Sequence, residues 1–377
     1  MFKTFRYRLF PTHSQRERLE AVLETCRRFY NDCLSERKAV YELEGRAIGK
    51  LEQLRCVKVH KSNNPFAAGI HSHILQVVVS DLDKTFQAFF RRVKAGETPG
   101  YPRFKAKNRF RSFGFKELNN GFKIDGRRLR LSGIGRVAVR WHRPLEGMIK
   151  TLRVICKTDK WYAAFSCEVA PRLLPPLDNE VGIDAGLSSL FVLSSGVHVE
   201  NPHWYRRSQR KLRVLQRSVA RKKKDGENRR KAVSTFARFA EHVANQRKDF
   251  LNKLVGTLVC CFGRIAVEDL SINHMVKGNF AKSILDAGWG YFRQRLLAKA
   301  ESAGRAVALI DPAYTTQDCC QCGHRQKLSL KERWYSCSCG NYCHRDENAA
   351  LNVLAAGRAV WALSPALAGL VQEAAAL

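Results

Sequence analysis

Gly182-Ile183-Asp184-Ala185-Gly186 decides how this chain of 377 residues is built, because an apolar run ends there in an acid between two glycines. Two later stretches also place an acid at the end of an element. Ala266-Val267-Glu268-Asp269-Leu270 closes a second apolar run, and Cys343-His344-Arg345-Asp346-Glu347 lies at the start of a predicted helix. Strands and helices in this order predict a mixed α/β fold in which the three acids meet at one edge of a sheet.

Three converging carboxylates repel one another unless cations neutralise them. Taken singly, Asp184 can be a turn residue, Glu268 can end its strand by accepting from a backbone amide, and Asp346 can cap a helix. Together they predict a site for two Mg²⁺ ions, which accept carboxylate oxygens and keep some of their waters. Such a pair supports phosphodiester hydrolysis: one ion activates a water for in-line attack, and the other stabilises the leaving 3′-oxygen. In this scheme Asp184 bridges the two ions.

Four of the 13 cysteines have the spacing of a zinc site. They form the pattern Cys319-x2-Cys322-x14-Cys337-x1-Cys339, and paired thiols separated by a short loop specify one tetrahedral Zn²⁺. Cys320 and Cys343 are spare thiols, and either could replace one of the four. The alternative is that all are incidental reduced thiols. A small ribbon does not fold without its metal, so we expect a structural zinc.

The charge of the chain predicts a polyanionic partner. Lysine and arginine number 66 against 34 acidic residues, which gives a formal net charge of +32. A protein this basic repels itself unless it binds a polyanion, so we expect nucleic acid. An anionic membrane would need one basic amphipathic helix, whereas these charges are spread along the chain. The first residues have no signal-peptide core, no apolar stretch is long enough to span a bilayer, and the cysteines fit no disulfide framework.

Three basic regions are candidates for contact with nucleic acid. Residues 99–116 interleave basic and aromatic side chains, which can contact phosphates and bases, although a basic loop entering a sheet has the same composition. Residues 205–231 hold 13 Lys/Arg and predict a helical hairpin facing a polyanion, or else a solvated face. On the following helix, the local positive charge favours contact of Asn245 and Arg247 with a nucleic-acid backbone, although simple solvent exposure is the alternative. The candidates are Arg103, Lys105, Arg221, Lys222, Lys223, Asn245 and Arg247.

Local patterns predict the order of the elements. Alternating or apolar runs predict strands within 1–12 and at 129–131, 136–141, 152–157, 161–169, 181–185, 197–199, 264–270 and 305–311. Helical stripes predict helices at about 12–35, 71–94, 205–231, 232–260, 289–303 and 347–356, with Thr12 and Gln15 as a capping box on the first. The Pro- and Leu-rich segment 171–176 indicates a linker, where we place the main domain boundary.

Four motifs together resemble those of the TnpB family, transposon-encoded proteins related to the miniature type V CRISPR nucleases. They are Val181-Gly182-Ile183-Asp184, Val267-Glu268-Asp269-Leu270, Tyr314-Thr315-Thr316-Gln317 before Cys319, and His344-Arg345-Asp346-Glu347-Asn348-Ala349-Ala350-Leu351-Asn352. The likeness extends upstream to Tyr7-Arg8-Leu9-Phe10-Pro11-Thr12 and Gly100-Tyr101-Pro102-Arg103-Phe104-Lys105, so it covers nearly the whole chain.

The resemblance implies a multidomain α/β protein. Its parts are a RuvC-like, RNase H-type nuclease domain (178–311 and 344–358), a zinc-ribbon insert that binds target nucleic acid (312–343), a wedge-like β-barrel (1–11 and 99–172), a helical recognition insert (12–98) and an unassigned apolar tail (359–377). By motif match Asp184, Glu268 and Asp346 carry over as the catalytic triad, and the four cysteines of the spacing pattern as zinc ligands. Tyr7 joins the candidates for nucleic-acid contact.

The resemblance also implies a function. Such proteins are RNA-guided, Mg²⁺-dependent DNA endonucleases that bind a guide RNA from the transposon end and cut double-stranded DNA beside a short flanking motif. Pairing with the guide supplies sequence specificity, while the protein reads the flanking motif. Two other functions fit the same residues: a regulator of transposition that binds without cutting, and a transposase that joins strands. We expect a prokaryotic, cytosolic, nucleoid-associated protein; the sequence does not distinguish a monomer from a dimer.

Overall fold

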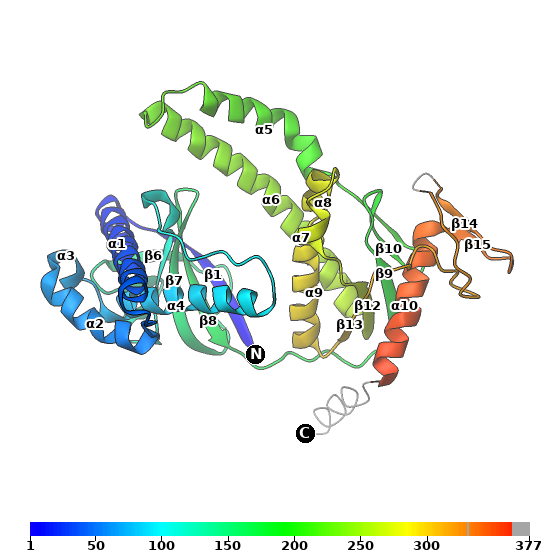
Figure 1. Cartoon of the computed structure of the whole chain (residues 1–377), viewed down its shortest axis with the longest axis horizontal. Helices are drawn as coiled ribbons and strands as arrows, with labels where there is room; N and C mark the ends of the chain where they lie inside the picture. The colour runs from blue at the N-terminus through cyan, green and yellow to red at the C-terminus, as the bar shows by residue number, and fades with distance from the viewer. Residues whose placement is uncertain (330–331, 364–377) are drawn as a thin grey trace. The chain divides into compact units, whose positions relative to one another are not determined.

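The computed structural model describes residues 1–329 and 332–363, and these divide into two units at Ala170 and Pro171, where the Pro- and Leu-rich segment begins (Figure 1). Each unit has a hydrophobic core of its own. None of the helices in these residues is both long and apolar enough to cross a membrane. The predicted C-terminal tail falls mostly at 364–377, outside the described residues.

The first unit is built on one sheet of eight strands. Their order is β2-β7-β8-β1-β6-β5-β4-β3, and all pairs except β3 with β4 are antiparallel. The strands are β1 (Phe2–Phe10), β2 (Ser112–Phe115), β3 (Glu117–Leu118), β4 (Gly121–Asp125), β5 (Arg128–Leu131), β6 (Gly135–Arg140), β7 (Met148–Lys157) and β8 (Lys160–Glu168). The two end strands, β2 and β3, are separated along the chain only by Lys116, so one continuous segment pairs first with β7 and then with β4.

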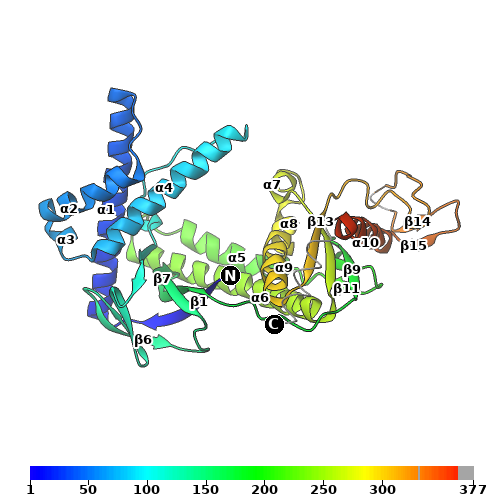
Figure 2. The ribbon, with the colours of Figure 1, turned by 90° about the horizontal axis from the view of Figure 1, so that it is seen from below.

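Four helices gather beside this sheet, as Figures 1 and 2 show. They are α1 (His13–Glu44), α2 (Lys50–Asn63), α3 (Pro65–Ala68) and α4 (Ser72–Lys94), and a 3-10 turn follows at Lys107–Arg109. Helix α1 starts with the predicted capping box, because Thr12 Oγ1 accepts from the Gln15 N–H and Gln15 Oε1 accepts from the Thr12 N–H. The helix runs well past the predicted end, and it stops where Gly45 adopts the left-handed conformation (φ 68°).

The second unit contains a mixed sheet of five strands in the order β11-β10-β9-β12-β13. The strands are β9 (Glu180–Asp184), β10 (Ser189–Leu193), β11 (His198–Glu200), β12 (Arg264–Glu268) and β13 (Ala306–Ile310). Strands β9, β12 and β13 are parallel, whereas β10 and β11 are antiparallel to their neighbours. The carboxyl ends of the three parallel strands therefore lie at the same edge of the sheet.

Helices cover both faces of this sheet. Helices α6 (Glu227–Cys261) and α9 (Trp289–Ala303) lie on one face, and α10 (Arg345–Leu363) lies on the other, as both views show (Figures 1 and 2). Ile183, Ile265 and Val267 enter the core beneath α6 and α9, whereas Ala266 packs with Val353 of α10. The remaining elements are α5 (Trp204–Ala220), α7 (Ile272–Met275), α8 (Ala281–Ala287) and the two-stranded sheet of β14 (Trp334–Ser336) and β15 (Tyr342–His344).

The observed elements differ from the predicted ones at several further points. Helix α2 was not predicted, because only Gln53 and Val57 of it are buried and its apolar stripe is weak. Strand β10 was also missed; it lies between the predicted strands 181–185 and 197–199 and forms an antiparallel hairpin with each of them. The break between α5 and α6 falls at 221–226 instead of 231, since Asp225 has a positive φ of 65°. Helix α10 begins at Arg345, which places Asp346 inside its first turn.

Candidate active site and metal centre

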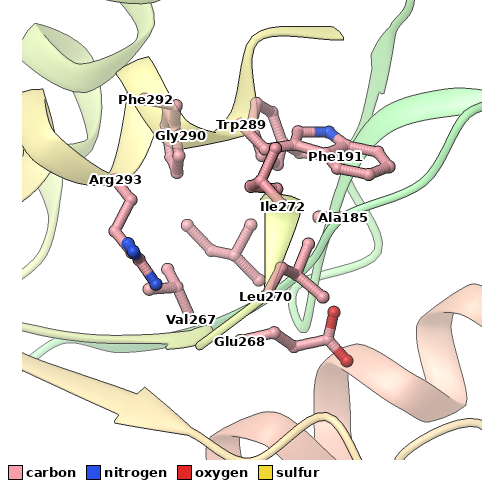
Figure 3. Close-up of a pocket in the computed structure, with 11 residues that line it drawn as sticks. Ala185, Phe191, Val267, Glu268, Leu270, Ile272, Trp289, Gly290, Phe292 and Arg293 are labelled. Atoms are coloured by element: carbon pink, nitrogen blue, oxygen red, sulfur yellow. The ribbon is translucent and has the colours of Figure 1, made fainter. Parts of the chain in front are cut away.

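Strand alternation points Asp184 and Glu268 toward the same face of the sheet. Strands β9 and β12 pair in register, Ile183 with Val267, so the residues that follow are neighbours at the strand ends. Because Ile183 and Val267 point into the core under α6 and α9, the next side chain on each strand points to the opposite face, which α10 covers. In Figure 3 the Glu268 carboxylate points away from the apolar side chains of Leu270 and Trp289, toward α10.

Two glycines allow α10 to approach this sheet closely. A Cβ atom at Gly182 would lie 2.2 Å from the Ala350 carbonyl oxygen, and one at Gly357 would lie 2.5 Å from the Ala266 Cβ. Without side chains at these positions, the helix backbone rests directly on β9 and β12. The start of α10 carries Asp346, so this contact brings the third acid to the strand ends that carry the other two.

Burial and mutual repulsion act on the acid at the centre of this site. Asp184 is only 6% exposed. Its burial, followed by the negative charges of Glu268 and Asp346, raises its pKa well above the usual value, although Arg345 opposes the shift. Burial also raises the pKa of Glu268. The hydrogen bond that Thr315 Oγ1 donates to Glu268 Oε1 (2.9 Å) lowers this pKa, but burial has the larger effect. A divalent cation would relieve the same repulsion that protons relieve here.

The three carboxylates are spread more widely than the thiols described below. Among the described residues, one group of three or more acidic, cysteine or histidine side chains has all its ligand atoms within 4.8 Å of one another, and it consists of cysteines. The oxygens of Asp184, Glu268 and Asp346 do not meet this limit. A site for two ions needs no such compactness, because the ions themselves lie about 3.5–4 Å apart and share the ligands between them. Oxygen ligands of this kind fit Mg²⁺.

The four cysteines of the predicted zinc site come together. The sulfur atoms of Cys319, Cys322, Cys337 and Cys339 all lie within 4.8 Å of one another. Cys319 Sγ is 3.7 Å from Cys339 Sγ, and Cys322 Sγ is 3.5 Å from Cys337 Sγ. Sulfurs bound about 2.3 Å from one zinc at tetrahedral corners would be about 3.8 Å apart, so the arrangement fits that metal. Cys320 and Cys343 lie outside this group of four sulfurs.

The surroundings of the thiols favour one anionic sulfur. Burial raises the pKa of Cys319, but hydrogen bonds from the backbone of Cys322 and Gln321 and from the Asn341 amide outweigh it, and the pKa falls to about 6. For Cys339 a backbone hydrogen bond from Asn341 lowers the pKa, yet burial and the shared thiol protons raise it to about 12. A soft divalent cation would allow all four sulfurs to lose their protons.

Two residues predicted to contact nucleic acid have side chains that the described structure engages within the protein. Tyr7 is fully buried in β1, where its hydroxyl donates to the Pro144 carbonyl (3.2 Å) and its ring lies 4.6 Å from that of Trp141. Its ring is therefore part of the core and closed to a base. The guanidinium of Arg247 bonds to the Leu285 carbonyl and lies 3.9 Å from the Asp286 carboxylate. It joins α6 to α8 and is not a free cation.

The remaining candidates are open to solvent to differing degrees. Arg103 is exposed, while Lys105 is half-buried with its ammonium 5.5 Å from the Tyr30 ring centre. Arg221 and Lys223 are exposed in the turn after α5, and the ammonium of Lys222 folds back onto Ser218. Asn245 is exposed on α6.

One residue beside the acids carried no sequence signal. His198 of β11 bonds to the Glu347 carboxylate in the first turn of α10 (2.8 Å), and its ring lies 5.2 Å from that of His344. These partners are 149 residues apart, and a lone histidine near a hairpin does not indicate them. The Thr315 hydroxyl on Glu268 lies within a quoted motif, although the motif itself does not reveal the contact.

Three family models match parts of the chain. Residues 164–279 match one described as "Probable transposase", residues 289–353 match "Cas12f1-like, TNB domain", and residues 1–46 match "Helix-turn-helix domain". In the structure residues 1–46 form strand β1 and the single helix α1.

Two curated relatives resemble the chain over most of its length. A Streptomyces pristinaespiralis protein named "Putative RNA-guided DNA endonuclease" is 32% identical over 366 residues, which cover 95% of this chain and 90% of the relative. The Escherichia coli K12 protein named "Putative RNA-guided DNA endonuclease InsQ" is 29% identical and covers 96% of this chain, which spans 93% of that protein. The Sulfoacidibacillus thermotolerans protein "CRISPR-associated endodeoxyribonuclease Cas12f1" is 26% identical over 52% of this chain and 50% of its own.

One solved structure has a similar fold. It is "Cryo-EM structure of the Cas12f1-sgRNA-target DNA complex", which aligns with a TM-score of 0.64 over 94% of this chain and 98% of that chain. Sequence identity is 14%, so this likeness concerns the fold alone.

Proposed function

This chain belongs to the TnpB family of transposon-encoded proteins, and on that premise we propose that it is an RNA-guided, Mg²⁺-dependent DNA endonuclease. One site, formed by Asp184, Glu268 and Asp346, would cut both DNA strands. The observation that carries this proposal is the convergence of the three acids. They come from β9, β12 and α10, and burial together with the charges of the other two raises the pKa of Asp184.

Each acid has a defined role in the proposal. Asp184 is the most buried of the three acids, and the negative charges of both others act on it. It would therefore bridge two ions, and Glu268 and Asp346 would each complete the ligands of one ion. When bound, Mg²⁺ supplies an acidified water and stabilises charge on the leaving oxygen. Thr315 holds the Glu268 carboxylate through its hydroxyl and so limits the rotamers of that ligand. His198 holds Glu347 and thereby steadies the turn of α10 that carries Asp346.

The other parts of the chain would bind the nucleic acids. We assign 178–311 and 344–358 to a RuvC-like nuclease domain, 312–343 to the zinc ribbon, 1–11 and 99–172 to the wedge-like domain, and 12–98 to the recognition insert. The exposed cations of α5 and its following turn suit the phosphates of guide RNA or target DNA, and Arg103 suits the same partners. On the ribbon, the exposed rings of Trp334 and Tyr342 stack 5.2 Å apart and offer a surface for an unpaired base.

The cysteine cluster would hold one structural Zn²⁺. All four positions around the metal would be taken by sulfur, which leaves none for water or substrate. We place the protein in the prokaryotic cytosol, bound to its RNA and to DNA.

A plasmid cleavage assay with the co-purified RNA tests the proposal. The plasmid carries the sequence that matches the guide part of that RNA. We expect Mg²⁺-dependent linear product from the wild type, and loss of cutting with retained DNA binding in Asp184→Ala and Glu268→Ala, because each removes a ligand of the ions. Asp269→Ala is the matched control: this acid follows Glu268, is 54% exposed and pairs with Arg293, so its loss should leave cutting intact.

The same assay separates the alternatives. Full activity in Asp184→Ala would remove the assignment of the acids. Binding without any cutting by the wild type would favour a regulator of transposition. Products in which the 3′-oxygen of another strand has become bonded to the cut phosphate would indicate strand transfer. Sequence-specific cutting that survives digestion of the RNA would mean that the protein reads DNA without a guide.

A further inference from the structure

Buried asparagines connect the cysteine cluster to the helix that carries Asp346. Asn348, one turn into α10, is completely buried. Its Nδ2 donates to the Asp318 carbonyl (2.7 Å), and its Oδ1 accepts from the Cys320 N–H (2.9 Å). The Asn348 side chain is thus hydrogen-bonded to the backbone on both sides of Cys319. An amide is suited to this role because it both donates and accepts.

The next residue on the same helix face continues the contact. Asn352 lies four residues after Asn348, and its Nδ2 donates to the carbonyls of Thr315 (2.8 Å) and Asp318 (2.7 Å). The hydroxyl of Thr315 in turn donates to Glu268. The segment from Thr315 to Cys320 is therefore bonded to α10 along its length and to a second acid of the site.

A third asparagine links this segment to the sulfur atoms. Asn341 is 6% exposed, and its Nδ2 lies 3.3 Å from Cys319 Sγ and 3.5 Å from Asn348 Oδ1. A metal that fixes Cys319 would also fix Asn341, and through it Asn348. Buried polar networks of this kind are rigid when every member is bonded, and they loosen when one member is lost.

We propose that Asn348 and Asn352 are positioning residues through which the metal-bound cysteine cluster sets the places of Asp346 and Glu268. The ribbon would then be part of the support of the acids, in addition to any contact that it makes with nucleic acid. This inference rests on the proposed function, because it concerns the ions that the acids would hold. Neither asparagine would contact the substrate.

Mn²⁺ binding to the protein–RNA complex tests the coupling without relying on cleavage. We expect Asn348→Ala and Asn352→Ala to bind Mn²⁺ about tenfold more weakly in an electron paramagnetic resonance titration, since a lost buried hydrogen bond shifts an equilibrium by that order. Zinc content is measured on the same samples. Asn252→Ala is the matched control, because Asn252 accepts from Tyr291 and Arg295 and so joins α6 to α9 without contacting the ribbon or the acids.

A second measurement uses the unaltered protein. Zinc is removed with a selective chelator, and amide hydrogen exchange is followed at residues 345–350. We expect exchange there to become faster, while the strands of the first unit keep their protection. Loss of zinc together with Mn²⁺ in Asn348→Ala would also support the coupling.

The outcomes distinguish two failures. The first failure concerns the coupling alone. In that case the wild type binds Mn²⁺ and Asp184→Asn does not, but Asn348→Ala and Asn352→Ala bind it as well as the wild type, and removing zinc does not change amide exchange at 345–350. The coupling is then overturned and the endonuclease proposal stands. If the wild type binds no Mn²⁺ that depends on Asp184, the proposed function fails, and the coupling fails with it.

Discussion

Replacing Gly182 by alanine should displace the helix that carries Asp346. The new Cβ would lie 2.2 Å from the Ala350 carbonyl oxygen and 2.6 Å from the Leu354 nitrogen, whereas ordinary contact begins at 3.4 Å. Both atoms belong to the backbone of α10, so no side-chain rotation can make room. The helix has to move by about 1 Å, a misplacement that costs roughly 10²-fold in rate when it affects a catalytic group. Overpacking of this kind also destabilises a fold by about 1–3 kcal/mol.

The assay is single-turnover cleavage of the plasmid by the RNA complex at saturating Mg²⁺, with a thermal melt of each sample. We expect Gly182→Ala to remain folded, to melt a few degrees lower and to cut about 100-fold more slowly. Gly278→Ala is the control, because its added Cβ would meet nothing closer than the Met275 oxygen at 3.7 Å. A Gly182→Ala protein that melts and cuts like the wild type would refute the argument that the helix–sheet contact places Asp346.

Two further predictions concern charge and metal. Without divalent ions at neutral pH, Asp184→Asn should melt roughly 2–4 °C higher, the effect of about 1 kcal/mol in a unit of this size. A carboxyl whose pKa rises on folding contributes stability below its unfolded pKa of about 3.9, and it loses that contribution as the pH rises through the folded pKa. The higher melting temperature of the variant should therefore disappear in acid. A difference in melting temperature that does not depend on pH would contradict this. We expect mass spectrometry to find about one zinc ion per wild-type chain, none in Cys322→Ser and the wild-type content in Cys320→Ser; zinc loss in Cys320→Ser would assign that thiol to the site.

The sequence predicted the features that depend on local pattern. An apolar strand that ends in an acid needs only alternation to be recognised, and the bounds of α9 at Trp289 and Ala303 follow from one clear stripe and the glycines beside it. The cysteine spacing likewise predicted the four thiols that come together, although the sequence left Cys320 and Cys343 as alternatives. Their exclusion depends on where the chain turns.

The features that the sequence did not predict depend on distant partners. Alternation identified β1 as a strand and places Tyr7 on the same face as Phe5 and Leu9, but the motif resemblance made Tyr7 a contact candidate, and its partner Trp141 lies far away in the sequence. Arg247 had the composition of a nucleic-acid contact until the fold brought Asp286 beside it, because an ion pair across 39 residues leaves no local trace. The asparagines of α10 are ordinary helix residues in sequence, and only the returning segment from Thr315 to Cys320 gives them their role.

The order of the parts along the chain has a consequence for how the protein is made. Asp184 and Glu268 lie on strands that leave the ribosome early, whereas α10 comes only after the cysteine ribbon and has to return to pack against β9. Chains are synthesised from the amino terminus and fold as segments emerge. A product halted before α10 would carry only two of the three acids, so under the proposed function it would not cut DNA, and cutting would begin only once translation has passed the ribbon.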